Sequence, residues 1–230
     1  MDVHHIFFDL DRTLWDFETN SEITLRDIIK KFKLTQKGVP SAKEFIARYK
    51  IHNERLWGLY RRNKISKTDL RSKRFFITLQ EYNINDKNLS EKIGTEYIKK
   101  SPLKTNLFPF SIEVLDYLFD KYNLHIITNG FKEVQHTKLL SSHLDKYFQH
   151  VITSEEVGVK KPEKKIFDYA LNRTNAKANK SIMIGDDLMV DIIGSENAGI
   201  KGVYFNPESK NHNENISYEI SCLSELMQIL

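Results

Sequence analysis

The sequence has little cysteine and no long apolar run, and these absences narrow the classes of protein that it fits. Cys222 is the single cysteine among 230 residues, so no disulfide can form within the chain, which suits a reducing compartment. No apolar run approaches the length of a membrane span. An apolar segment begins within a few residues of Met1 and leaves no room for a secretory signal. We therefore expect a cytoplasmic protein with no membrane partner.

The sequence also lacks a large excess of either positive or negative charge. The 35 Lys and Arg residues nearly balance the 31 Asp and Glu residues, which gives a formal net charge of +4. Such a mild excess favours anionic small molecules but falls short of a nucleic-acid-binding signature. The basic clusters at 30–33 and 71–74 are interpreted as solvated helix faces. No nucleic-acid partner is expected, and the chain is long enough for one sizeable core and a smaller second lobe.

Five short apolar runs, rich in β-branched and aromatic residues, predict buried strands. Helical patterns lie between them; Ile112, Leu115, Leu118 and Phe119, for example, are spaced for one helix face. Strands that alternate with helices predict an α/β fold, a doubly wound parallel sheet with helices on both faces. The predicted strands are residues 3–8, 124–128, 150–153, 181–184 and 202–205.

More than one hundred residues separate the first two predicted strands, far more than a simple crossover needs. The segment 19–100 has no strand signal, and its patterns predict an inserted α-helical bundle. The sheet domain is then discontinuous, formed by 1–18 and 101–230. The helices are predicted near 20–33, 41–61, 66–83 and 88–100.

Polar residues gather where the predicted strands end. Ligands of open parallel sheets bind at the carboxyl ends of the strands, so these side chains are expected at one edge. An ammonium group is expected there too, because Lys161 follows the third strand. The residues at the strand ends are Asp9, Asp11, Thr128, Asn129, Asp186 and Asp187.

Phosphoryl transfer is the chemistry that uses such a set. A phosphate monoester is a dianion, so its charge must be cancelled before a carboxylate can attack it. Mg²⁺ held by Asp9 and Asp186 would do this, because Mg²⁺ prefers a few hard oxygens plus water. Lys161 would neutralise the phosphate, and the Thr128 hydroxyl with main-chain amides would complete its cradle.

The spacing of Asp9 and Asp11 suggests a division of roles. Side chains two residues apart on an extended segment project to the same side. One carboxylate can therefore attack phosphorus, while the other protonates the departing alkoxide and later activates water.

Four segments, in order along the chain, resemble the four motifs of the haloacid dehalogenase superfamily, whose phosphatases carry Asp-x-Asp-x-Thr in the first. One match alone is a weak signal, but four in order at the expected strand ends span the whole sheet domain. The segments are 9–14 (Asp-Leu-Asp-Arg-Thr-Leu), 127–130 (Ile-Thr-Asn-Gly), 158–162 (Gly-Val-Lys-Lys-Pro) and 185–191 (Gly-Asp-Asp-Leu-Met-Val-Asp).

The resemblance implies roles for the matched acidic residues. Asp9 is implied to be the nucleophile and a ligand of Mg²⁺. Asp11 is implied to be the acid/base and to lend its main-chain carbonyl to the metal, and Asp186 is a further ligand. Asp191 is implied to lie behind these ligands or to act as an occasional ligand, and Asp187 is a further candidate for a place behind them.

The resemblance also implies a phosphate site made by Thr128, Lys161 and Asn129, the last through its main-chain amide. Arg12 stands where relatives usually have Gly or Asp. It follows the first strand within a turn, so it either alters that turn or reaches the substrate.

The insert resembles the helical cap of the pyrimidine 5′-nucleotidase subgroup, at 49–57, 64–66 and 74–75. This resemblance implies that the substrate is a nucleoside monophosphate, a small phosphorylated metabolite. We expect the protein to be a monomer or a homodimer. Tyr49, Asn53 and Trp57 recur at i, i+4 and i+8, and they either bind the base or pack inside the bundle. Trp15 lies just after the first motif and is a further candidate for substrate specificity.

Other functions were weighed against this one. Dehalogenases of the superfamily generally lack an aspartate at the position of Asp11, so its presence favours phosphate chemistry. Phosphatases or mutases for small sugar or carboxylic acid phosphates remain alternatives, because they keep both aspartates. A phospho-receiver-like binding module is about half as long, carries no helical insert, and has an adjacent acidic pair rather than one spaced by a residue.

Overall fold

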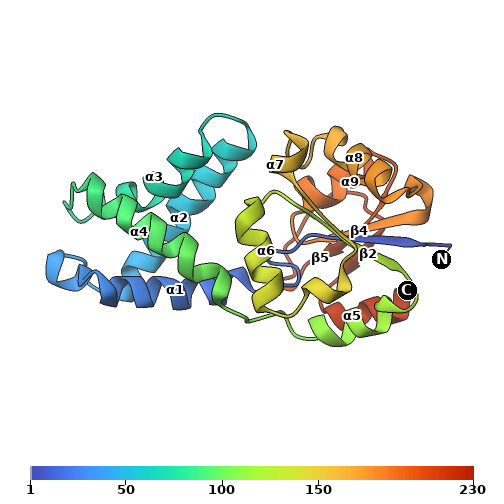
Figure 1. Ribbon diagram of the computed structural model, residues 1–230, viewed down its shortest axis with the longest axis horizontal. Helices are drawn as coiled ribbons and strands as arrows, with labels where there is room; N and C mark the ends of the chain where they lie inside the picture. The colour runs from blue at the N-terminus through green and yellow to red at the C-terminus, as the bar shows by residue number, and fades with distance from the viewer. Residues whose placement is uncertain (1) are drawn as a thin grey trace. The chain divides into compact units, whose positions relative to one another are not determined.

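A computed structural model describes residues 2–230 of the chain (Figure 1). The chain divides into two compact units: the segment up to Phe17 with Thr105–Leu230, here called the sheet unit, and Glu18–Lys104, the helical unit. The insert predicted from the sequence was 19–100. No helix within residues 2–230 is both long and apolar enough to cross a membrane.

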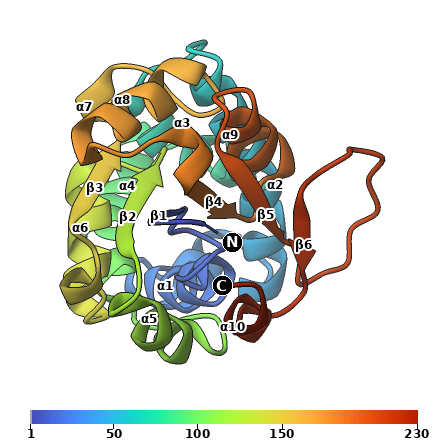
Figure 2. The ribbon, with the colours of Figure 1, turned by 90° about the vertical axis from the view of Figure 1, so that its right-hand side faces the viewer.

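The sheet unit contains one six-stranded parallel sheet in the order β3-β2-β1-β4-β5-β6 (Figure 2). The first five strands agree with the sequence prediction, with bounds shifted by one or two residues. β6 was missed, because its three residues Tyr-Glu-Ile form a short edge strand after a polar loop. The strands are β1 (His5–Phe8), β2 (Asn123–Thr128), β3 (His150–Thr153), β4 (Ser181–Gly185), β5 (Lys201–Phe205) and β6 (Tyr218–Ile220).

Helices cover both faces of this sheet (Figure 2). Side chains alternate between the faces along a strand, so Ile6 and Phe8 pack with α5, α6 and α10, whereas Phe7 packs with α8 and with the segment that follows α9. Both layers are apolar, which confirms the doubly wound architecture. The helices are α5 (Ser111–Phe119), α6 (Lys132–Ser141), α7 (Ser154–Val157), α8 (Lys164–Thr174), α9 (Gly194–Glu196) and α10 (Leu226–Ile229).

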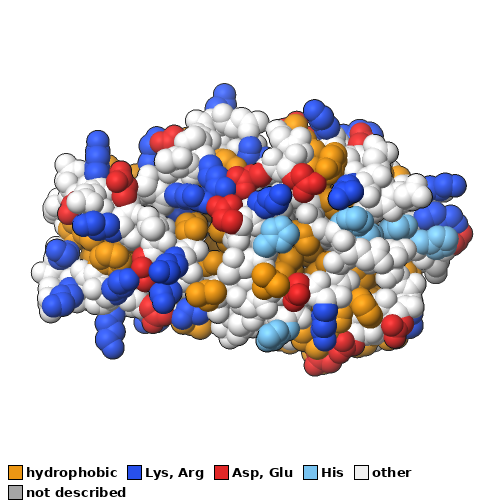
Figure 3. All heavy atoms as spheres, in the orientation of Figure 1, with side chains coloured by type: hydrophobic (Ala, Val, Ile, Leu, Met, Phe, Trp, Pro, Cys, Tyr) orange, Lys and Arg blue, Asp and Glu red, His pale blue; other side chains and the backbone are white. Residues whose placement is uncertain are grey.

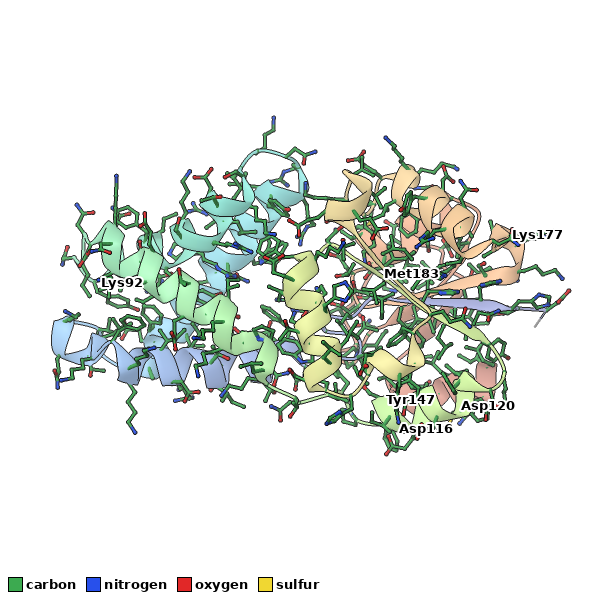
Figure 4. The ribbon with its side chains drawn as sticks, in the orientation of Figure 1. Lys92, Asp116, Asp120, Tyr147, Lys177 and Met183 are labelled. Carbon is green, nitrogen blue, oxygen red and sulfur yellow. The ribbon has the colours of Figure 1, made fainter. Side chains whose placement is uncertain are left out.

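The face predicted for α5 is only half correct. Leu115 and Leu118 are buried, but Ile112 and Phe119 are exposed. Near the end of α5 the Tyr147 hydroxyl donates a hydrogen bond to Asp116, with 2.5 Å between the oxygens (Figure 4). This contact joins the turn before β3 to the outer side of the helix.

The helical unit contains four helices that pack around a core of their own. Three have side-chain caps on their first turns: Ser41, Ser66 and Asp86 accept hydrogen bonds from main-chain N–H groups three residues further on. On the face in Figure 3, acidic and basic side chains are interspersed. The helices are α1 (Phe17–Lys31), α2 (Ala42–Arg61), α3 (Lys67–Gln80) and α4 (Lys87–Lys100).

The register of the parallel strands aligns their carboxyl ends. Phe8 at the end of β1 pairs with Ile126 on one side and Ile184 on the other. The residues that follow these three strands therefore emerge at the same edge of the sheet, in its middle.

Candidate active site

Asp9 is the first residue after β1 and lies at the centre of the carboxyl edge. Its main-chain N–H donates to the Ile184 carbonyl, with 2.8 Å between N and O, which extends the β1–β4 pairing by one residue. The residue is only 8% exposed. The pairing with β4 thus fixes the main chain of Asp9, and its side chain lies in a largely desolvated position.

Lys161 directs its ammonium group at this carboxylate. Its Nζ lies 2.6 Å from Asp9 Oδ1, 2.6 Å from Asp191 Oδ1 and 2.7 Å from the Ile127 carbonyl oxygen, and the residue is 1% exposed. Burial alone would lower the pKa of Lys161, but the Asp191 and Asp9 carboxylates outweigh it and raise that pKa above its ordinary value. A permanent buried positive charge therefore lies beside Asp9.

Three acidic side chains form a cluster that could hold a metal ion. Asp9, Asp186 and Asp191 each offer a carboxylate oxygen, and these oxygens lie within 4.8 Å of one another. Gly185 leaves room for the Asp191 side chain, because a Cβ at position 185 would lie 2.4 Å from Asp191 Oδ2. The prediction from the sequence named Asp9, Asp186 and the main-chain carbonyl of Asp11 as ligands, with Asp191 behind them or as an occasional ligand.

The electrostatics of this cluster indicate too much negative charge for the protein alone. Burial raises the pKa of Asp9 to about 7, against the opposing effect of Lys161 and with a further rise from Asp191. Burial also raises the pKa of Asp186 well above its ordinary value; Asp9 and Asp191 add to this, and Arg12 opposes it. Lys161 supplies one positive charge to three carboxylates, so three hard oxygens with only partly compensated charge fit a small divalent cation such as Mg²⁺.

Asp11 lies next to the cluster but has different partners. The Gln135 side-chain amide donates to Asp11 Oδ2 across 2.7 Å, and Lys138 Nζ donates to Oδ1. Both donors come from α6, one helical turn apart. Asp11 thus forms its ion pair with a lysine other than Lys161, which separates the two carboxylates that the sequence assigned to attack and to proton transfer.

Thr128 ends β2, and its hydroxyl oxygen accepts hydrogen bonds from the Gly130 N–H and from the Gln135 amide, each across 3.0 Å. The Asn129 side chain contacts the Lys161 main chain: Nδ2 donates to its carbonyl oxygen (3.0 Å), and Oδ1 accepts from its N–H (2.9 Å). A role for the main-chain amide of Asn129 in phosphate binding stays a prediction. The role of its side chain was not foreseen.

The remaining acidic residues of the fourth motif organise their own loop. Asp187 Oδ1 accepts from the Val190 N–H (3.1 Å) and caps a π-helix, Leu188–Ile193. The Asp187 N–H in turn donates to Asp191 Oδ2 (3.1 Å). These hydrogen bonds orient Asp191 toward Lys161 and also hold the loop that carries Asp186 in place.

Arg12 occupies the turn that follows β1 and Asp9. Its φ of 66° is in the left-handed region, a conformation that favours Gly over residues with a side chain. The Arg12 N–H donates to the Trp15 carbonyl (2.9 Å), and the guanidinium lies 4.9 Å from the centroid of the Phe17 ring. Arg12 both shapes the turn and brings positive charge near Asp186.

The aromatic candidates for substrate specificity are mostly interior. Trp15 is fully buried in the sheet unit, with Lys138 Nζ 4.2 Å from the centroid of its ring. Tyr49 is buried in the helical unit and stacks on Phe75 at a centroid separation of 5.0 Å. These positions favour the packing alternative over direct substrate contact.

Asn53 is buried with Tyr49. Its Oδ1 accepts from the Arg74 guanidinium (2.9 Å) and from the Tyr49 hydroxyl (3.3 Å). Trp57, by contrast, is partly exposed and lies edge-on to Tyr60. Of the three residues in the predicted stripe, Trp57 keeps a surface that a ligand could reach.

Gln135 and Lys138 are the site residues that sequence reasoning missed. A lysine in a helix is usually a solvated one, and nothing in the motif pattern marked this one. One signal was available: the two residues are three apart on the helix that follows the Thr128 loop, so they share a face.

Comparisons with known proteins agree with this geometry. A family model described as haloacid dehalogenase-like hydrolase matches residues 6–205. The pyrimidine 5′-nucleotidase YjjG of Escherichia coli is 32% identical over 98% of this chain and 96% of its own, and the pyrimidine 5′-nucleotidase PynA of Streptococcus pneumoniae is 28% identical over 98% and 94%. The crystal structure of the HAD-hydrolase YfnB of Bacillus subtilis, bound to magnesium, superimposes with a TM-score of 0.89 at 28% identity and covers 99% of this chain and 98% of its own.

Proposed function

This chain belongs to the haloacid dehalogenase-like hydrolase family, and from that premise we propose that it is a magnesium-dependent phosphomonoester hydrolase for nucleoside 5′-monophosphates. The observation that carries the proposal is the pair of differently partnered carboxylates, Asp9 with Lys161 and Asp11 with Lys138. A nucleophile and a separate acid/base are what cleavage through an aspartyl-phosphate intermediate requires.

The carboxylates of Asp9, Asp186 and Asp191 would hold the metal. Their proximity and the raised pKa values of Asp9 and Asp186 support a cation at this point. When bound, Mg²⁺ supplies charge neutralisation between the nucleophile and the phosphate. The YfnB structure, which contains magnesium, supports the choice of ion.

The residues of the chain divide two chemical steps between them. A carboxylate oxygen of Asp9 attacks phosphorus, the ester P–O bond breaks, and the departing oxygen takes a proton from Asp11. Water then attacks the aspartyl phosphate and gives a proton to Asp11, which frees the Asp9 carboxylate and inorganic phosphate. Lys161 and Thr128 would hold the phosphate through both steps.

The choice of nucleotides as substrates rests on the relatives. Two of them, named pyrimidine 5′-nucleotidases, match nearly the whole chain, helical unit included. A small soluble mononucleotide also agrees with the mild positive charge of the chain. We keep the cytoplasmic location and the monomeric or homodimeric state as predictions.

A hydrolysis screen with Mg²⁺ tests the proposal. The panel would hold the 5′-monophosphates of uridine, thymidine, cytidine, adenosine and guanosine, together with hexose phosphates, glyceraldehyde 3-phosphate and phosphoglycolate. We expect the pyrimidine nucleotides to give the highest kcat/KM. If a sugar or carboxylic acid phosphate exceeded every nucleotide by tenfold, the nucleotidase assignment would be wrong and the phosphatase assignment would stand.

A further inference from the structure

Helix α6 presents two buried polar side chains to Asp11. Gln135 is 0% exposed and Lys138 is 4% exposed. The Gln135 amide donates to Oδ2 of Asp11 across 2.7 Å, and the Lys138 ammonium donates to Oδ1. Each carboxylate oxygen therefore receives one hydrogen bond from α6.

The burial of Lys138 is unusual enough to need an explanation. Burying an ammonium group costs several kcal/mol unless the group is well paired, and lysines ordinarily extend to reach solvent. Lys132, on the same helix, is exposed. Lys138 instead contacts the Asp11 carboxylate on one side, and its Nζ lies 4.2 Å from the centroid of the Trp15 ring on the other, a cation–π contact that compensates part of the desolvation.

The Gln135 amide connects two functional side chains. Its Nε2 carries two hydrogens; one is donated to Asp11 and the other to the Thr128 hydroxyl oxygen, across 3.0 Å. Gly130 makes room for it, because a Cβ at that position would lie 1.6 Å from Gln135 Nε2. The loop after β2 is thus shaped to admit this amide.

We infer that Gln135 and Lys138 are positioning residues that orient the Asp11 carboxylate for proton exchange with the leaving group. The inference rests on the function proposed above. A carboxylate offers about four lone-pair sites, so the two donors from α6 leave lone pairs of Asp11 open for the proton that passes to the departing oxygen. The two hydrogen bonds hold the Asp11 carboxylate in one orientation. This orientation matters because a displacement of a reacting group by about 1 Å can lower the rate about a hundredfold.

The test compares substrates that differ in how much they need an acid. Para-nitrophenyl phosphate has a leaving group that departs with little protonation, whereas a nucleoside 5′-monophosphate needs a full proton. Asp11→Asn provides the reference for loss of the acid. We expect Lys138→Met to lower kcat for the nucleotide about tenfold more than for para-nitrophenyl phosphate, with little change in KM, and Lys138→Arg to recover part of that loss.

Matched controls separate positioning from packing. Lys132→Met removes an exposed lysine from the same helix and should leave the ratio of the two activities unchanged. Gly130→Ala displaces the Gln135 amide without deleting a functional group, and Gln135→Met deletes the amide at nearly constant size. Both should lower nucleotide turnover selectively, and they carry the test if Lys138→Met fails to fold by circular dichroism.

The outcomes distinguish this inference from the proposed function. Equal losses of kcat on both substrates, or no loss on either, would overturn the positioning role and leave the phosphatase assignment intact. A wild-type protein inactive on every phosphomonoester with Mg²⁺ present would overturn both together.

Discussion

The side chain of Asn129 and the main chain of Lys161 form a reciprocal pair of hydrogen bonds, 3.0 Å from Nδ2 to the Lys161 carbonyl and 2.9 Å from the Lys161 N–H to Oδ1. An amide at the end of β2 thereby holds in place the backbone that carries the buried ammonium group. This relationship leads to the first prediction.

Asn129→Ala should leave the fold intact but release the Lys161 loop. If Lys161 binds phosphate as proposed, a small displacement of its charge is costly, so we expect kcat/KM to fall by about tenfold to a hundredfold and inorganic phosphate to inhibit more weakly. Asn172→Ala, at an exposed position on α8, is the control. Unchanged phosphate inhibition in Asn129→Ala would contradict the role given to this pair.

The second prediction concerns the nucleophile. Asp9→Asn keeps the shape of the side chain but removes the attacking charge, so steady-state turnover should fall by at least about a thousandfold. Beryllium fluoride, which mimics a phosphoryl group, should bind the wild type and not the variant. Asp120→Asn changes an exposed carboxylate (Figure 4) and should have no effect. Near-normal turnover by Asp9→Asn would exclude the covalent mechanism.

The third prediction concerns the metal. Mg²⁺ at a hundred times its dissociation constant should stabilise the wild type by about 2.7 kcal/mol, and chelation should abolish turnover. Asp186→Asn should lose both the stabilisation and the activity. Without metal the same variant should be at least as stable as the wild type, because burial and the neighbouring carboxylates disfavour the Asp186 charge. An apo variant clearly less stable than the apo wild type would contradict this account of the cluster.

The fourth prediction separates the two interpretations of the stripe on α2. Asn53→Ala leaves the Arg74 guanidinium without an acceptor, so we expect a stability loss of about 1–3 kcal/mol and a modest change in specificity. Trp57→Ala should cost little stability but should change the ratio of nucleotide to para-nitrophenyl phosphate activity. Thermal melts and both activity assays on each variant distinguish the two roles. A change in specificity found only in Asn53→Ala would contradict the assignment of Asn53 to packing and Trp57 to substrate contact.

The fifth prediction is a pH dependence of stability. Burial, and next the proximity of His5 and His150, lower the pKa of His125 from 6.5 to about 3; the Phe7 ring also packs against it. Between these values the unfolded chain takes up a proton that the folded chain does not, so the unfolding free energy contributed by this group is present above pH 6.5 and is lost as the pH falls.

The slope from His125 is at most about 1.4 kcal/mol per pH unit. Denaturant unfolding between pH 7 and pH 4 should show a shallower decline for His125→Gln than for the wild type. His136→Gln, at an exposed position on α6, should keep the wild-type slope. Equal slopes for all three proteins would rule out His125 as a source of the acid sensitivity.

The strands and the carboxyl-edge residues could be predicted from sequence because each rests on a local signal. The run ending at Phe8 is apolar and is followed at once by Asp9, and the topology of parallel sheets then brings the strand ends together. The contacts of Lys138 and Asn129 could not be predicted, because they depend on the packing of α6 and on the loop before α8, for which the chain holds no periodic pattern. β6 was missed because Tyr218–Ile220 is too short for alternation to be informative.

Lys138 lies against Trp15, and this contact makes the fluorescence of Trp15 sensitive to its surroundings. The chain has two tryptophans, Trp15 in the sheet unit and Trp57 in the helical unit, so each compact unit carries its own intrinsic fluorophore. In Trp57→Phe the remaining emission would come from an indole that touches the ammonium partner of Asp11. Quenching of this emission would report changes at Asp11, and Trp15→Phe would give the separate signal of the helical unit.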